Sequence, residues 1–200
     1  HTDVDPKLSY HAAMLSKCDL LTGMVGEFPE LQGIIGRHLA LHGKESKEVA
    51  QAIEEQYLPR QAGGDLPVSA LGKTLALADR LDTLVGVFTI GKKPTGLKDP
   101  YGLRRASLAV LRIVIESKLN IDLLVCLKQA SSFFPKNLGA DVMVDEVFDY
   151  SIERLRTYFS DHDVAPDVID SVLANRPTCP NDIASRINAV CNFRKNPSAQ

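Results

Sequence analysis

The sequence has no cysteine pair at metal-binding spacing and no long apolar run. Its four cysteines, at positions 18, 126, 179 and 191, form no CxxC pair, so the usual zinc-site pattern is absent. No apolar run approaches the roughly 20 residues that a membrane helix needs. Scattered cysteines are typical of a reducing compartment, which predicts a cytoplasmic protein. Cys18 and Cys126 fall inside apolar helical patterns and are predicted to be small core residues.

Strand-like alternation, internal repeats and low-complexity segments are missing as well. The apolar residues recur instead at spacings of three and four, which predicts an all-α fold, a bundle of about nine helices. A chain of 200 residues can bury roughly 70% of its unfolded surface, so it needs no disulfide or metal to fold. Because the first residue is His1 rather than Met, we expect a fragment or a processed chain.

Proline, glycine and capping residues set the expected helix boundaries. A soft boundary near residues 134–141 is predicted to separate a main domain, 1–134, from a helical extension, 135–200. The predicted helices cover residues 9–26 with Ser9 as cap, 31–42, 49–57, 67–88 opening on Pro67, a segment with Asp99 as cap and Pro100 in its first turn that runs to about 114, 120–134 with Asn120 as cap, 142–159, 166–173 and 180–193.

The segment between the fourth and fifth of these helices is strongly basic. The whole chain has 23 Lys and Arg against 25 Asp and Glu, yet the stretch from Lys92 to Arg105, which reaches into the fifth helix, holds five cations and one acid, Asp99. A solvated turn explains this pattern, and so does a partner that carries phosphate. The segment has no GxxxxGK[ST] or GxGxxG motif, which excludes a P-loop. Tyr101 could stack on a base or pack on the bundle. The five candidate phosphate ligands are Lys92, Lys93, Lys98, Arg104 and Arg105.

Asp79 and Asp82 lie three residues apart and share one face of the fourth predicted helix. With apolar neighbours on that face, at least one carboxylate is expected to be half buried and to need a partner. A functional interpretation is a metal ligand or an acid/base pair. The structural interpretation, which we favour, is an ion pair with an arginine: Arg37, Arg104 or Arg105, with the last two preferred.

Histidine offers two further metal candidates. The adjacent pair His162-Asp163 sits in a polar joint between helices, where helix capping explains it better. Three scattered histidines could converge with Glu27 and Asp79 on a metal, and this alternative stays open. Those histidines are His11, His38 and His42. No Ser-His-Asp or Cys-His constellation is suggested by spacing, so no catalytic residue is predicted.

Three stretches closely resemble one family. They are ADRLDTLVGVFTIGKKPTGLKDPYGLRR at 78–105, CDLLTGMVGEFPELQGIIG at 18–36 and VAQAIEEQYLPRQAGGDLP at 49–67. The chain resembles the β subunit of bacterial tetrameric glycyl-tRNA synthetase, specifically over 17–112 and more weakly in the last third. The resemblance implies an HD-like helical domain with a linker, which supports tRNA binding. It also implies partners: glycine tRNA, the synthetase α subunit, which holds the ATP and magnesium chemistry, and other β-subunit domains.

The ALAD segment that ends at Asp79 resembles the last motif of HD-superfamily phosphohydrolases, which hold a metal with His, His-Asp and a final Asp. The position that matches the His-Asp pair is Gly26-Glu27-Phe28, which lacks it. The resemblance therefore implies a retained fold with lost ligands, and a lone Asp79 is a poor metal site. Two alternatives remain: an active HD-type phosphohydrolase, and a scaffold that does not contact RNA.

Overall fold

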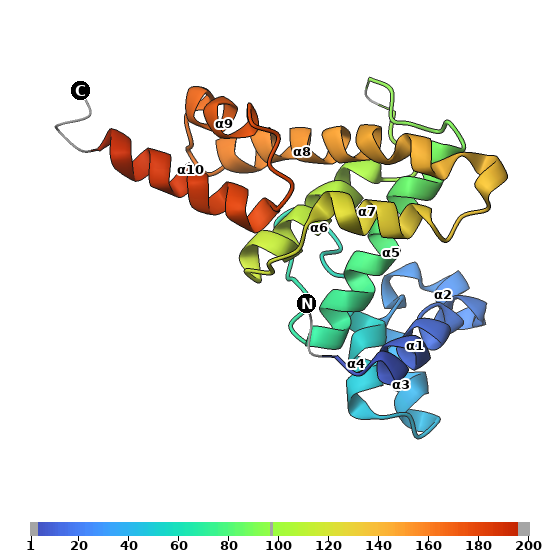
Figure 1. Ribbon diagram of the computed structural model, residues 1–200. Helices are drawn as coiled ribbons and strands as arrows, with labels where there is room; N and C mark the ends of the chain where they lie inside the picture. Colours follow the sequence, from blue (N-terminus) through green and yellow to red (C-terminus); the bar gives the residue numbers. More distant parts are fainter. Residues whose placement is uncertain (1–3, 97, 196–200) are drawn as a thin grey trace. The chain divides into compact units, whose positions relative to one another are not determined.

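The computed structural model describes residues 4–96 and 98–195, and all the regular secondary structure of these residues is helical (Figure 1). They form ten α-helices and four short 3-10 helices. This confirms the all-α prediction, whereas the HD-like architecture stays a prediction. No helix of the described ranges is both long enough and apolar enough to cross a membrane.

The chain divides into two compact units, residues 1–80 and 81–200, and the division lies inside α5 (Ala70–Thr89). From the sequence we expected a division between residues 134 and 135. In the structure α7 (Leu123–Ser131) and α8 (Val144–Ser160), which flank that point, pack against each other within the second unit. The assignment of 1–134 to an HD-like domain and of 135–200 to an extension stays a prediction.

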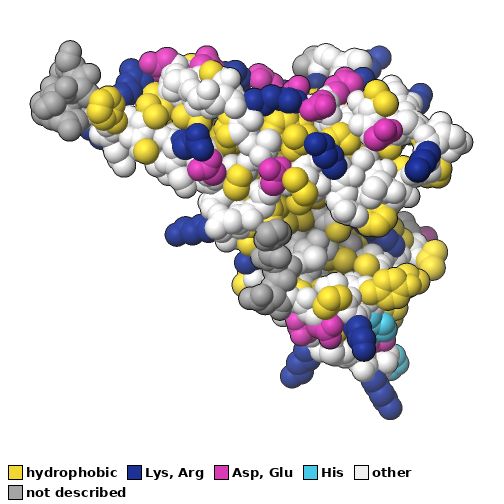
Figure 2. Space-filling view, in the orientation of Figure 1, with side chains coloured by type: hydrophobic (Ala, Val, Ile, Leu, Met, Phe, Trp, Pro, Cys, Tyr) yellow, Lys and Arg dark blue, Asp and Glu magenta, His cyan; other side chains and the backbone are white. Residues whose placement is uncertain are grey.

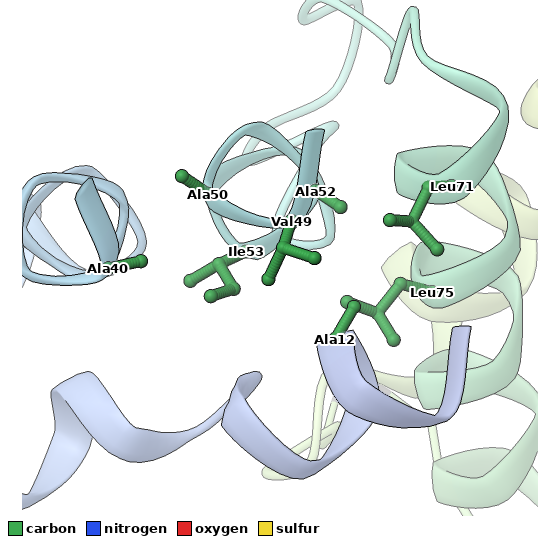
Figure 3. Packing of buried hydrophobic residues seen from close by; sticks show 8 residues of the cluster. All are labelled: Ala12, Ala40, Val49, Ala50, Ala52, Ile53, Leu71 and Leu75. Carbon is green, nitrogen blue, oxygen red and sulfur yellow. The ribbon is translucent and has the colours of Figure 1, made fainter. Parts of the chain in front are cut away.

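The first unit has its core around α4, which contacts both α1 and α3. α4 begins where the sequence supplies a cap, because the Ser46 side chain accepts a hydrogen bond from the Val49 N–H at 3.2 Å. The elements are α1 (Pro6–Leu15), η1 (Cys18–Leu21), α2 (Gly23–Glu27), η2 (Pro29–Leu31), α3 (Ile34–His42), α4 (Lys47–Glu55) and the first half of α5. The buried apolar cluster (Figure 3) contains Ala12, Ala40, Val49, Ala50, Ala52, Ile53, Leu71 and Leu75.

Six large apolar side chains of the first unit remain exposed in or directly beside α1, η1 and α2. Figure 2 shows hydrophobic side chains gathered over this part of the molecule. Between Lys17 and Arg37 the sequence has no Lys, Arg or His, so the charged residues of this stretch are all acidic. The exposed residues are Tyr10, Met14, Leu20, Leu21, Met24 and Phe28.

The second unit is organised around α8, which contacts α6, α7 and α9, while α10 packs on α6 and α9. After the second half of α5, its elements are α6 (Leu103–Glu116), α7, η3 (Lys136–Leu138), η4 (Ala140–Met143), α8, α9 (Pro166–Leu173) and α10 (Pro180–Arg194). Its largest fully buried side chains include Leu103, Leu111, Ile113, Leu123, Leu127, Phe148, Leu155, Ile169, Ile183 and Ile187.

The first predicted helix, 9–26, is wrong as a continuous element. α1 starts at Pro6, capped by Asp5, and ends at Leu15. The break has a polar cause, because the Asp19 carboxylate is buried and accepts a 2.6 Å hydrogen bond from the Gly33 N–H. A buried carboxylate needs such a donor, and the chain folds back to supply it. The same break leaves Cys18 exposed, which corrects its predicted core position, whereas Cys126 is half buried.

Two predicted caps are also corrected. α5 begins at Ala70 instead of Pro67, and the Ser69 hydroxyl caps it by accepting from the Gly72 N–H at 2.9 Å. α7 is capped by Asp122, while the predicted cap Asn120 accepts a hydrogen bond from Asn181 at 2.7 Å. By contrast, α9 has the predicted bounds and α10 begins at the predicted proline.

Candidate nucleic-acid interface

The basic loop, residues 90–102, connects α5 to α6 within the second unit. Its middle is a tight turn in which the backbones of Thr95 and Lys98 exchange two hydrogen bonds, at 2.9 and 3.1 Å. Gly96 in this turn has φ +50, in the left-handed region that glycine adopts at little cost. These two backbone bonds bring Thr95 and Lys98 together within the loop.

Asp99 joins this loop to α6. Its two carboxylate oxygens accept hydrogen bonds from the Leu103 N–H at 2.8 Å and the Arg104 N–H at 2.9 Å. The sequence predicted a cap at Asp99 followed by a proline in the first helical turn. The capping bonds are present, but the helix begins at Leu103, so Pro100 lies before it. A carboxylate at this end also complements the helix dipole.

The five predicted phosphate ligands fall into two groups. The Lys93 ammonium lies 2.6 Å from the Glu146 carboxylate of α8, and Arg104 donates to the Gly96 carbonyl oxygen. The side chains of Lys92, Lys98 and Arg105 are exposed, and the described residues offer them no hydrogen bond or ion pair. The loop and the first turn of α6 thus carry three cations that are open to an external anion, and two that are at least partly engaged within the protein.

Tyr101 lies in the same loop as Lys92 and Lys98. The residue is 48% exposed, so it is partly covered by the protein and partly open to solvent. An aromatic ring in the same loop as exposed cations is a common arrangement in proteins that bind single-stranded nucleic acid. Stacking on a base stays a prediction for this residue.

Asp79 forms an ion pair with Lys17 rather than with an arginine. The two charged groups lie 2.7 Å apart, and the Asp79 side chain is 31% exposed. The Lys17 ammonium also lies 5.0 Å from the centre of the Tyr57 ring, and burial raises the pKa of Tyr57 to about 12. A pair this exposed typically contributes about 0–1 kcal/mol, well below the cost of breaking a fully buried pair. An ion pair of Asp82 stays a prediction.

The described residues contain no group of three or more His, Cys, Asp or Glu side chains that could hold a metal ion. His11 lies instead 2.7 Å from the Glu45 carboxylate, and the ring of His162 bonds the Tyr158 carbonyl at 2.6 Å. His38 and His42 are exposed on α3. The HD-type phosphohydrolase alternative therefore gains no support from the described side chains.

We expect no stoichiometric transition metal at Asp79, because an ammonium group already occupies its carboxylate. Elemental analysis of the purified protein should find iron, manganese and zinc far below one equivalent. Lys17→Ala should not create a site, since one carboxylate is too few ligands for tight binding. A full equivalent of metal that is lost in Asp79→Ala would contradict this prediction.

Several residues with clear structural roles were missed in the sequence. Glu146 neutralises Lys93 from 53 residues away, and Lys17 does the same for Asp79 from outside its helix. Arg80 is buried and donates to carbonyl oxygens of the first unit. For Arg80 a signal existed, because the residues four before and four after it, Ala76 and Leu84, are apolar and share its helix face.

Comparison with known proteins identifies the family of this chain. Residues 3–174 match the family described as "Glycyl-tRNA synthetase beta subunit". The glycine–tRNA ligase β subunit of Edwardsiella ictaluri is 47% identical over 195 residues, which are 98% of this chain and 28% of the relative. The Pseudomonas aeruginosa protein of the same name is 49% identical over 189 residues, 94% of this chain and 28% of the relative. The chain therefore spans about a quarter of the length of these relatives, and it belongs to the glycyl-tRNA synthetase β-subunit family.

Proposed function

We propose that this chain is a non-catalytic part of a glycine–tRNA ligase β subunit, which supports the binding of tRNA and its positioning for aminoacylation by the α subunit. It needs no cofactor of its own, and ATP and magnesium act in the α subunit. Its partners are glycine tRNA, the α subunit and the other domains of the β subunit, and its location is the cytoplasm.

One observation carries the tRNA part of this proposal: three exposed and unpaired cations on the basic loop and the first turn of α6, Lys92, Lys98 and Arg105. Cations on a protein with a net charge of −2 are available to an anionic partner when no carboxylate neutralises them. Phosphate contacts of this type position a nucleic acid without reading its bases. Lys93 and Arg104, which the sequence predicted as ligands, take supporting positions in this proposal, because Glu146 and the Gly96 carbonyl oxygen already engage them.

The triple variant Lys92→Ala/Lys98→Ala/Arg105→Ala should weaken the binding of glycine tRNA. Each phosphate contact contributes about 0.9 to the slope of log affinity against log salt on duplex DNA, so losing three should flatten the slope by up to about 2.7. Fluorescence anisotropy at about 50 mM and about 200 mM salt measures both quantities. At the lower salt concentration we expect the dissociation constant to rise at least about tenfold.

The matched control is Lys128→Ala/Lys136→Ala/Lys195→Ala, which removes three exposed cations of the same unit that are not part of the loop. This control should retain the affinity and most of the salt slope of the original chain. If both triple variants lose the same affinity for tRNA, the effect comes from the change in net charge and not from the loop. If the loop variant binds tRNA as the original chain does, and its melting curve by circular dichroism is unchanged, the tRNA-binding proposal is wrong and the scaffold function replaces it.

A further inference from the structure

One face of α8 carries three residues spaced four apart, Glu146, Tyr150 and Arg154, and the first of them contacts the basic loop. Glu146 holds Lys93 of the loop at 2.6 Å. One turn on, the Tyr150 ring lies 5.2 Å from the ring of Phe88, at the end of α5. A further turn on, the guanidinium carbon of Arg154 lies 5.3 Å from the centre of the Tyr150 ring. Arg154 is therefore stacked on an aromatic ring that is itself packed in place.

Arg154 differs from the other arginines of α8 and its surroundings. Arg156, two residues on, pairs with Glu153 and Asp170, and Arg176 pairs with Asp145 and Asp149. Within residues 4–96 and 98–195, the guanidinium of Arg154 has no carboxylate partner and no hydrogen bond. Its Nε atom is buried without a partner, so its two terminal amino groups are the donors left for solvent or a ligand.

The unpaired guanidinium and the basic loop share one electrostatic environment. Burial raises the pKa of Tyr150, the charge of Asp99 raises it further, and the charges of Arg154 and Arg104 act in the opposite direction. The Asp99 carboxylate is already bonded to two backbone N–H groups of α6. The positive charge of Arg154 therefore adds to that of the loop, and no described carboxylate pairs with it.

We propose that Arg154, stacked on Tyr150, binds a phosphate of an RNA backbone and extends the cationic surface of the basic loop onto α8. This inference rests on the proposed tRNA-binding function. A guanidinium presents its donors as a rigid, planar fork that matches two phosphate oxygens. Stacking on an aromatic ring fixes the plane of the fork before the ligand arrives, so less rotamer entropy is lost on binding.

Arg154→Lys tests the fork, because it keeps the charge and removes the planar geometry. We expect the dissociation constant for glycine tRNA to rise about tenfold, with the salt slope unchanged. Arg154→Gln should give a similar loss of affinity and also flatten the slope by about 0.9. The matched control is Arg156→Lys on the same helix, whose two carboxylate partners predict less than about a twofold change.

Tyr150 supplies a second, independent comparison. Tyr150→Phe keeps the ring and should retain affinity, with a melting temperature that is unchanged or raised, because the hydroxyl it removes is buried without a partner. Tyr150→Leu removes the ring and should weaken tRNA binding to the same extent as Arg154→Lys. In the double variant the two losses should not add, since both act through one stacked group.

The outcomes separate this inference from the function on which it rests. If the loop triple variant weakens tRNA binding and Arg154→Lys and Arg154→Gln do not, the proposed function stands and the role of Arg154 is overturned. If neither change affects binding, or if the chain does not bind tRNA measurably, both are overturned. Weaker binding in Arg154→Lys together with an unaffected loop variant would support the α8 contact and remove the loop from the interface.

Discussion

Arg80→Met is expected to lower the free energy of unfolding by about 2–4 kcal/mol, because it leaves buried carbonyl groups without a donor. The Arg80 guanidinium donates to the Gln56 carbonyl oxygen at 2.7 Å, to the Leu58 carbonyl oxygen at 2.8 Å and to the Ala76 carbonyl oxygen of its own helix at 3.0 Å. The first two carbonyls lie just past the end of α4, where no further helical N–H is available. Arg80 therefore completes the hydrogen bonding of one helix from another.

Burial lowers the pKa of Arg80, and the neighbouring charge of Asp79 acts in the opposite direction. The charge itself is thus costly to bury, and the gain comes from the hydrogen bonds.

Arg80→Lys should recover only part of the loss, because an ammonium lacks the fork that reaches separate carbonyls. Urea unfolding measures the free energy of unfolding of each variant. The control Arg37→Met removes an exposed arginine paired with Glu54 in the same unit, and should cost less than about 1 kcal/mol. Equal costs for Arg80 and Arg37 would contradict this account.

Gly72→Ala should destabilise the protein by about 2–4 kcal/mol, although alanine is the better helix former. Gly72 is buried in the first turns of α5, and a Cβ atom there would collide with the Glu55 carboxylate and lie 2.8 Å from the Ser69 hydroxyl oxygen. Glu55 accepts from the Ser69 N–H at 3.0 Å and from its hydroxyl at 2.5 Å. Moving Glu55 aside would therefore also disturb the cap of α5.

A matched glycine exists in α2. Gly26→Ala meets no atom within 4 Å, so it should be neutral or stabilise by up to about 1 kcal/mol. If contact with Glu55 is the cause, thermal and urea unfolding should show a lower stability for Gly72→Ala and an equal or higher stability for Gly26→Ala. Glu55→Ala should then remove most of the additional cost of Gly72→Ala in the double variant. If the stability losses of Gly72→Ala and Glu55→Ala simply add in the double variant, contact with Glu55 is not the source of the strain.

The secondary structure of the last two helices was determined locally. Pro166 and Pro180 each open a helix at the predicted residue, because proline lacks the N–H that a first helical turn leaves unbonded. The apolar period also predicted the all-α fold, since a helix with one apolar face must bury it against other helices. The resemblance of three stretches to one family pointed to the family that the comparisons show.

The roles of charged and polar side chains required the tertiary structure. Asp79 pairs with Lys17, 62 residues earlier in the chain, and Lys93 with Glu146, 53 residues later. The predicted first helix does not continue through Asp19, whose buried carboxylate meets the Gly33 N–H instead. Local spacing predicts where a helix forms, because helical hydrogen bonds join residues four apart. It does not predict which distant side chain neutralises a charge, because that partner is chosen only when the packed helices bring it within a few ångströms.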